Sequence, residues 1–186
     1  MTRIRTSQTD PLRIATLAVG NRGGAIGITF APGKHQDAAM TGVWKRDLDT
    51  DIAAICTWGA KHLVTLLEPH EFVELGIEPL PERARAAGLR WYGLPITDGA
   101  APDFRFLEPW KQWGPQFMQA LQNGDRIVVH CKGGLGRAGL TGCLLLLDSG
   151  TVTSADQAMA RTRAVRPGAI ETLEQEIFLR AWRSST

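Results

Sequence analysis

A cysteine and an arginine stand six positions apart in Cys131-Lys132-Gly133-Gly134-Leu135-Gly136-Arg137. A thiolate is a strong nucleophile, and a guanidinium can bind two oxygens of one phosphoryl group. The intervening glycines allow a tight loop whose N–H groups turn inward, and the helix that follows adds its positive dipole end. That field would lower the pKa of the thiol. The pattern therefore predicts transfer of a phosphoryl group to sulfur.

The residues after the cysteine form the predicted phosphate-binding loop, which comprises Lys132, Gly133, Gly134, Leu135, Gly136, Arg137 and Ala138. A plainer interpretation of Cys131 is a small buried hydrophobic residue at a strand end. The preceding Ile127-Val128-Val129 run, the glycines and the following helix favour the catalytic interpretation. His130 is a supporting residue that could bond to the loop backbone and orient the thiolate. Lys132 could raise the positive potential at the mouth of the site, or be a solvated lysine.

This loop resembles the signature loop of the cysteine-dependent protein tyrosine phosphatases. More narrowly, it resembles that of the cyclin-dependent-kinase-associated phosphatases within the dual-specificity group. The resemblance covers most of the chain, and its further segments are 28–34, 95–99, 102–103, 168–170 and Glu174-Gln175. It implies a dual-specificity-phosphatase-like fold and a phosphocysteine intermediate. It also implies that Gln175 orients the attacking water, although a solvated helix residue is the plainer interpretation of a glutamine.

Such a reaction needs an acid, because attack on a phosphate monoester expels an alkoxide or phenoxide. Asp98 and Asp103 both precede the helical pattern that begins at Phe104. Asp98 matches the position of the acid in the resembled family, but an Asp before Gly99 is also typical of a turn. Asp103, which follows Pro102, is a good helix N-cap and remains the second candidate.

The residue after the arginine departs from the resembled family, most members of which carry Ser or Thr there. In this chain it is Ala138. The missing hydroxyl would bond to the cysteine sulfur while the phosphocysteine breaks down, and its loss costs ~1.5–3 kcal/mol, or about one to two decades in rate. The phosphatases of regenerating liver also carry Ala there. Thr141, one helical turn later, is a possible substitute. We therefore expect slow breakdown of the phosphoenzyme.

The remaining chain alternates between strand and helix patterns, which predicts an α/β three-layer sandwich with a central, mostly parallel sheet flanked by helices. The expected strands are 12–17, 26–30, 62–67, 89–94 and 126–130. The expected helices are 47–60, 71–75, 82–87, 104–121, 140–148, 154–165 and 172–182. Residues 1–11 are expected to be a flexible leader and 12–186 a single phosphatase domain. A loop at the carboxyl end of a central strand is the usual ligand position in such sheets.

The net charge of +2 does not favour a nucleic-acid partner, and no apolar run is long enough for a membrane span. Three widely spaced cysteines, at positions 56, 131 and 143, favour a reducing, cytoplasmic location. The histidines do not lie at metal-ligand spacing, so we expect no metal and no cofactor. Lys34 and the pair Lys45-Arg46 could flank the cleft, or be ordinary surface charges.

We therefore predict an enzyme that hydrolyses phosphotyrosine, and phosphoserine or phosphothreonine if the cleft is shallow, on a phosphorylated protein. A phosphatase for a non-protein ester such as an inositol phosphate is the alternative enzyme. A slow or non-catalytic phosphoprotein-binding module is the contrasting class. The oligomeric state, the physiological substrate and any redox role of Cys56 or Cys143 remain open.

Overall fold

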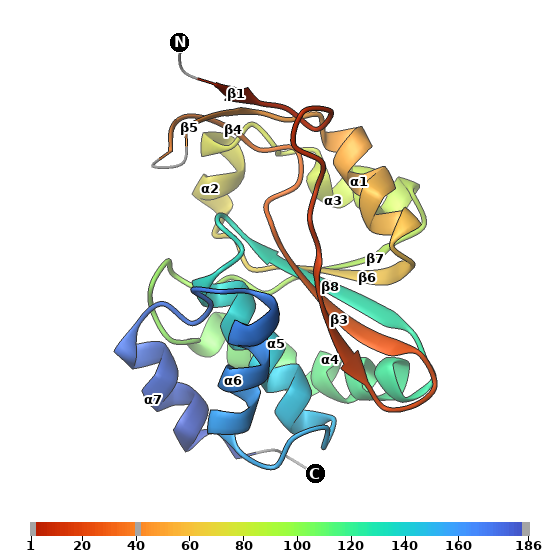
Figure 1. Cartoon of the computed structure of the whole chain (residues 1–186), viewed down its shortest axis with the longest axis vertical. Coiled ribbons are helices and arrows are strands. Elements are labelled where there is room, and N and C mark those ends of the chain that lie inside the picture. Colours follow the sequence, from red (N-terminus) through yellow and green to blue (C-terminus); the bar gives the residue numbers. More distant parts are fainter. Residues whose placement is uncertain (1–2, 40–41, 184–186) are drawn as a thin grey trace.

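A computed structural model describes residues 3–39 and 42–183, and a five-stranded sheet forms its centre (Figure 1). The strand order is β2-β3-β8-β6-β7. Strands β3, β8, β6 and β7 are mutually parallel, and β2 pairs antiparallel with β3. The bounds are β2 Ala15–Val19, β3 Gly24–Phe30, β6 Ala60–Thr65, β7 Arg90–Gly93 and β8 Arg126–Cys131. The expected mostly parallel sheet is confirmed.

Helices cover both faces of this sheet, because strand β8 directs apolar side chains to either side. Ile127 and Val129 belong to one core cluster, and Val128, between them, belongs to another. The first cluster packs against α4 Phe104–Gln122, α5 Gly136–Asp148, α6 Ala155–Val165 and α7 Leu173–Ala181. The second packs against α1 Leu48–Thr57 and α3 Leu80–Ala86. This division produces the three-layer arrangement. The short helix α2 Pro69–Glu74 comes directly after β6 in the chain.

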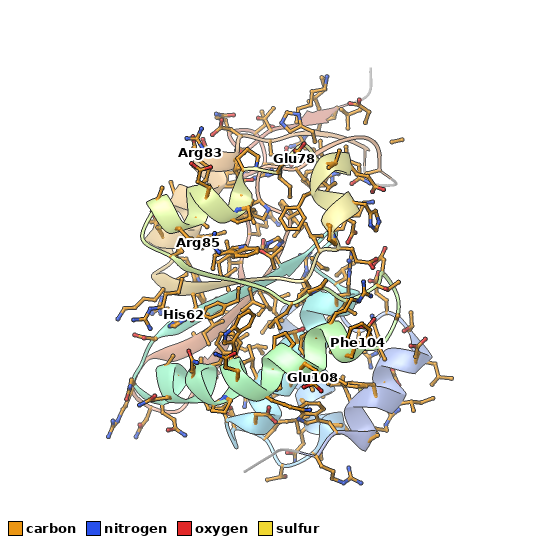
Figure 2. All side chains as sticks on the ribbon, turned by 180° about the vertical axis from the view of Figure 1, so that it is seen from behind. His62, Glu78, Arg83, Arg85, Phe104 and Glu108 are labelled. Carbon is orange, nitrogen blue, oxygen red and sulfur yellow. The ribbon has the colours of Figure 1, made fainter. Side chains whose placement is uncertain are left out.

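Helix α4 shows how the apolar spacing positions these layers. Phe106, Trp110 and Phe117 are buried at helical intervals and contact the main core. Figure 2 shows Phe104 and Glu108 at the start of the same helix, and Phe104 is exposed. The helix therefore presents one apolar stripe to the sheet and begins beside the loop that carries both candidate acids.

A second, small sheet was not expected from the sequence. It has the order β1-β5-β4, with β1 Ile4–Arg5, β4 His35–Ala39 and β5 Gly42–Lys45. These strands are short and lack a clear apolar alternation, so period-2 patterning gives no signal for them.

The expected flexible leader, residues 1–11, falls partly outside the described residues. Its described part has specific contacts: β1 pairs in parallel with β5, and Arg46 Nη1 donates to the carbonyl oxygens of Thr6 and Asp10. The Ser7 hydroxyl donates to the carbonyl oxygen of Asp47. Flexibility of the leader and the domain boundary at residue 12 stay predictions.

Helix α5 begins at Gly136, earlier than the expected start at 140, so the signature loop passes directly into a helix N-terminus. Within residues 3–39 and 42–183, no helix has both the length and the apolarity that a membrane crossing requires.

Candidate active site

The loop after β8 surrounds the sulfur of Cys131. Strand β8 lies between β3 and β6. Its β-branched run ends at Val129, and the strand itself ends at Cys131, opposite Phe30 of β3. The thiol is buried, and the N–H of Gly134 donates to its sulfur at 3.2 Å. Gly134 has φ +69°, and a Cβ there would lie 2.4 Å from the backbone carbon of Thr29. Glycine is therefore required at the point where the loop turns its N–H toward the sulfur.

The outer side of this loop is held by two cations through its carbonyl groups. Arg166 donates from Nε to the carbonyl oxygen of Gly134 at 2.9 Å and from Nη2 to that of Gly133 at 3.0 Å. Lys34 Nζ donates to the carbonyl oxygen of Lys132 at 3.4 Å. The Lys132 ammonium lies 3.2 Å from the Glu74 carboxylate, so its charge is partly offset.

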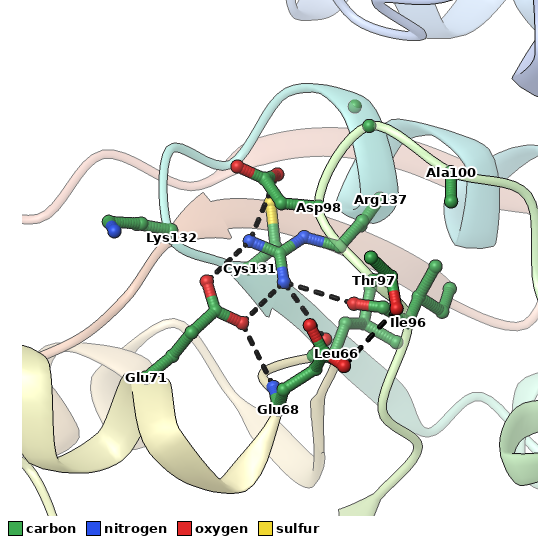
Figure 3. Close-up of polar contacts among 12 residues, drawn as sticks. Leu66, Glu68, Glu71, Ile96, Thr97, Asp98, Ala100, Cys131, Lys132 and Arg137 are labelled. Atoms are coloured by element: carbon green, nitrogen blue, oxygen red, sulfur yellow. Dashed lines mark hydrogen bonds and ion pairs between the residues drawn. The ribbon is translucent and has the colours of Figure 1, made fainter.

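Arg137 is buried beside Cys131 and held by a carboxylate that the sequence analysis missed. Its Nη1 and Nη2 donate to Glu71 at 2.6 and 2.9 Å, a bidentate pair, and Nη1 also donates to the carbonyl oxygen of Ile96 at 3.1 Å (Figure 3). Burial acts against its charge, but the Glu71 hydrogen bonds and the charges of Cys131, Glu71 and Asp98 raise the pKa of Arg137 above its ordinary value. The guanidinium is therefore permanently charged and fixed in orientation.

Glu71 lies near the start of α2, which follows the carboxyl end of β6. Its Oε2 also accepts the backbone N–H of Glu68 at 2.9 Å, and this hydrogen bond is part of a capping box between Glu68 and Glu71. Pro69 occupies the first helical position. Burial acts to raise the pKa of Glu71, but hydrogen bonds from Arg137 and the Glu68 N–H hold it below its ordinary value. The Glu68-x-x-Glu71 spacing after a buried strand was the available signal for this residue.

The structure separates the two candidate acids. Asp98 Oδ1 lies 3.1 Å from Arg137 Nη2, and its side chain is 69% exposed. Asp103 caps α4 instead: its Oδ1 accepts the N–H of Arg105 at 2.9 Å, and the Arg105 guanidinium binds both of its oxygens. These hydrogen bonds lower the pKa of Asp103. Asp98 thus reaches Arg137, whereas Asp103 caps α4, as its N-cap pattern predicted.

Gln175 is fully buried, so the expectation of a solvated helix residue is wrong. Its Oε1 accepts the N–H of Glu171 at 3.0 Å, and its Nε2 donates to the carbonyl oxygen of Ala100 at 3.4 Å. A Cβ on Gly136 would lie 3.1 Å from Gln175 Nε2. Gln175 therefore lies between the loop of Asp98 and the start of α5.

Glu171 is a second residue that the sequence analysis missed. Its Oε2 accepts the N–H of Gly136 at 2.8 Å, at the N-terminus of α5. The preceding Ile170 has φ +59°, an unfavourable conformation for a β-branched residue, and its N–H donates to the carbonyl oxygen of Leu135. This strained segment holds the start of α7 against the signature loop.

The start of α7 also holds the loop of Asp98. The Thr172 hydroxyl donates to the carbonyl oxygen of Gly99 at 2.9 Å, and Glu174 Oε1 accepts the N–H of Ala101 at 2.8 Å. The segment 170–174 therefore fixes the positions of the signature loop and the loop of Asp98 relative to each other.

His130 is buried under the loop, and burial lowers its pKa to about 3, so the ring is neutral. Its Nε2 lies 2.8 Å from the Thr65 hydroxyl, which also accepts the Trp91 Nε1–H at 2.9 Å. The Thr65 hydroxyl can donate to Nε2 while it accepts from Trp91. These partners on β6 and β7 fix the base of the cysteine loop.

Ala138 and Thr141 are both buried in the first turns of α5. The Thr141 hydroxyl oxygen has no hydrogen-bond partner among the described residues.

Burial raises the pKa of Cys143 to about 12, and its sulfur lies 3.3 Å from the Thr162 hydroxyl. A thiol with that pKa is a poor nucleophile, which disfavours Cys143 as a partner for oxidised Cys131. In the described part of the chain, no group of three or more His, Cys, Asp or Glu side chains is arranged to hold a metal ion.

Known proteins are similar to this chain in sequence or in fold. Mouse cyclin-dependent kinase inhibitor 3 is 28% identical over 177 residues, which cover 93% of this chain and 79% of the mouse protein. Zebrafish protein tyrosine phosphatase domain-containing protein 1 is 36% identical over 132 residues, covering 66% of this chain and 18% of that protein. The crystal structure of kinase associated phosphatase with its catalytic-site cysteine changed to serine superposes with a TM-score of 0.79, at 24% identity over 91% of this chain and 92% of that one.

A family model covers most of the domain described above. It matches residues 37–179, and its description is Swiss Army Knife protein, DSP-PTPase phosphatase domain. The match includes the cysteine loop, the loop of Asp98 and the segment of Gln175. The chain therefore belongs to the dual-specificity and protein tyrosine phosphatase family, as a DSP-PTPase phosphatase domain of the Swiss Army Knife type.

Proposed function

We propose that this chain hydrolyses phosphate monoesters on proteins through a phosphocysteine on Cys131. The observation that carries the proposal is the buried Cys131 sulfur, which accepts the Gly134 N–H beside an arginine locked by Glu71. A nucleophile, an inward N–H group and a fixed guanidinium match the charge that develops on a phosphoryl group during its transfer. The loop 132–138 binds the phosphoryl oxygens, with Arg137 holding two of them.

In the first half-reaction, the Cys131 thiolate attacks phosphorus, so an S–P bond forms as the P–O bond to the leaving group breaks. Asp98, protonated at that stage, gives its proton to the leaving oxygen. Its ion pair with Arg137 has to open first, because the incoming phosphoryl oxygens need the same guanidinium. The high exposure of the Asp98 side chain supports such a movement.

In the second half-reaction, water attacks phosphorus, the S–P bond breaks and inorganic phosphate leaves. Asp98, now ionised, accepts a proton from that water. We assign the placement of the water to Gln175, whose buried amide lies between Ala100 and Gly136. Ala138 offers no hydroxyl to the departing sulfur, so this half-reaction is the slower one.

The substrate class we favour is phosphotyrosine in a protein, with phosphoserine and phosphothreonine as further substrates. The relatives named for protein tyrosine phosphatase activity and for association with a kinase support a phosphoprotein. We place the activity in the cytoplasm, since three widely spaced cysteines suit a reducing compartment.

A phosphorylated inositol is the second candidate substrate, favoured by three cations at the loop: Lys34 and Arg166, which donate to loop carbonyl oxygens, and Lys132. A solved structure named PTPMT1 in complex with PI(5)P superposes with a TM-score of 0.61 at 18% identity, a likeness of fold. The Glu74 carboxylate on Lys132 weakens this alternative, because it reduces the charge at the mouth.

The first test is hydrolysis of p-nitrophenyl phosphate and of phenyl phosphate, which has a poorer leaving group, across about pH 5 to 8. Cys131→Ser should abolish turnover of both. Asp98→Asn should reduce kcat/KM for phenyl phosphate more than for p-nitrophenyl phosphate, because kcat/KM reports the first half-reaction and the poorer leaving group needs the acid more. Asp103→Asn is the matched control and should keep this leaving-group dependence unchanged.

The substrate class follows from a comparison of kcat/KM on a phosphotyrosine peptide, a phosphoserine peptide and an inositol polyphosphate. Preference for the inositol ester would transfer the assignment to the second candidate. Binding of the phosphopeptide without turnover of any substrate would identify a binding module and contradict the enzymatic proposal.

A further inference from the structure

Lys34 is buried beside the cysteine loop, where the sequence suggested either a residue that flanks the cleft or a surface charge. It follows the carboxyl end of β3, whose last residue, Phe30, pairs with Cys131. The turn is fixed by Gly33, whose N–H donates to Asp51 Oδ2 at 2.8 Å. Only 4% of Lys34 is exposed. The fold therefore places an ammonium group directly behind the signature loop.

The contacts of this ammonium are rings and one carbonyl group. Its Nζ lies 4.2 Å from the centre of the Trp44 ring and 5.1 Å from that of Phe30, and it donates to the carbonyl oxygen of Lys132. Ring faces stabilise a cation, but burial of an ammonium without an anion is costly. An unbalanced charge in such a position calls for an anionic partner.

No carboxylate among the described residues forms an ion pair with Lys34. The nearby Asp51 is occupied by Arg46, at 2.7 and 2.8 Å, and by the N–H of Gly33. The other charges that act on Lys34 are the cations Arg46, Lys132 and Arg166, and the Cys131 thiolate. Within this environment the thiolate is the anion that favours the charged lysine.

Building on the proposed function, in which Cys131 is the nucleophile, we propose that Lys34 is the buried counter-cation of the Cys131 thiolate. The interaction is reciprocal, since the charged lysine favours the thiolate as much as the thiolate favours the charged lysine. Burial lowers the pKa of Lys34 to about 8, and the Cys131 charge acts in the opposite direction. Lys34 is therefore a positioning residue, which acts on the substrate through the sulfur.

Other charged groups also face the cysteine, and the experiment has to separate them from Lys34. Arg137 and Arg166 both interact with the Cys131 charge, and the α5 N-terminus adds its dipole. The anions on this side are Glu71 and Asp98, both held on Arg137, and His130 is neutral. Lys132 is on the same loop but is paired with Glu74, which makes it the matched control.

The test measures the rate of Cys131 alkylation by iodoacetamide as a function of pH on the full chain, with the modified peptide identified by mass spectrometry. Lys34→Met should raise the midpoint by about one pH unit, which corresponds to an approximately tenfold slower alkylation below the midpoint. Lys34→Arg, which keeps the charge, and Lys132→Met should stay closer to wild type.

An unchanged midpoint in a folded Lys34→Met variant would overturn the proposal and leave Lys34 as packing for Trp44. If that variant does not fold, Lys34→Gln is measured in its place and is read in the same way. Alkylation does not need turnover, so the two proposals fail separately. A midpoint shift in a chain without phosphatase activity would support the Lys34 role and contradict the proposed function, whereas an active enzyme without a shift would contradict only the Lys34 role.

Discussion

Asp98 Oδ1 lies 3.1 Å from Arg137 Nη2, so a carboxylate occupies the guanidinium that we propose as the binding group for a phosphoryl group (Figure 3). Arg137 therefore carries two carboxylates: Glu71, which is buried and bidentate, and Asp98, which is exposed. The buried one fixes the arginine, and the exposed one can leave. The guanidinium thus pairs with the residue that we propose as the acid.

Asp98→Asn should therefore change binding and turnover in opposite directions. The amide no longer competes for Arg137, so inorganic phosphate should inhibit several-fold more tightly, since an exposed ion pair is worth about 0–1 kcal/mol. The kcat/KM for a substrate with a poor leaving group should fall by about 10²–10⁴, because the acid of the first half-reaction is lost. Competitive inhibition constants and kcat/KM measure the two effects. Asp103→Asn should leave the inhibition constant unchanged, and an equal change there would argue against the assignment.

Glu71→Gln should destabilise the domain by about 3–5 kcal/mol, because it leaves the Arg137 charge buried without its bidentate partner. Chemical unfolding at neutral pH measures this loss. Glu74→Gln, on the same helix but exposed, is the control and should change stability by less than about 1 kcal/mol. Similar losses in the two variants would show that the buried pair does not stabilise the fold.

The same pair predicts a pH dependence of stability. The pKa of Glu71 is lowered in the folded chain, so its contribution is fully present above the unfolded-state pKa of about 4.3 and is lost as pH falls through the folded value. The difference in unfolding free energy between wild type and Glu71→Gln should therefore shrink as the pH falls below about 4. A difference that stays constant over this range would contradict the assignment of the shift to Glu71.

Ala138→Ser should accelerate breakdown of the phosphocysteine. A serine hydroxyl at the start of α5 could donate to the departing sulfur, which is worth ~1.5–3 kcal/mol, or about one to two decades in rate. Rapid-quench kinetics should show a burst in wild type that is reduced in the variant. The absence of a wild-type burst would mean that the first half-reaction limits turnover. Thr141→Val tests whether the buried hydroxyl one turn later already plays this part.

Gln175→Leu should slow the second half-reaction and leave the first largely unchanged. The leucine has a similar volume but cannot bond to Ala100 or to water, so the phosphoenzyme should accumulate. The burst amplitude and the steady-state rate separate the two steps. Glu171→Gln, which keeps an acceptor for the Gly136 N–H, is a conservative comparison and should retain most of the rate. A slower burst phase in Gln175→Leu would point to distortion of the loop of Asp98 instead.

Local patterns in the sequence were sufficient for the loop and for most elements. The apolar run before Cys131 predicted β8, the glycines predicted the tight loop, and Asp103 before Phe104 predicted the cap of α4. Each of these depends on contacts among residues close together in the chain. The element boundaries were less accurate: α5 begins at Gly136, because the loop geometry continues directly into the first helical turn.

The charges of the site were decided by tertiary structure. Glu71 meets Arg137 across 66 positions, because β6 and β8 are neighbours and their carboxyl ends meet at one edge of the sheet. Lys34 is buried by the same pairing, through β3 on the other side of β8. Residue types alone could not distinguish a surface lysine from this one, since burial depends on which strands become neighbours. The sequence thus determined which groups could react, whereas the order of the strands determined which charges surround them.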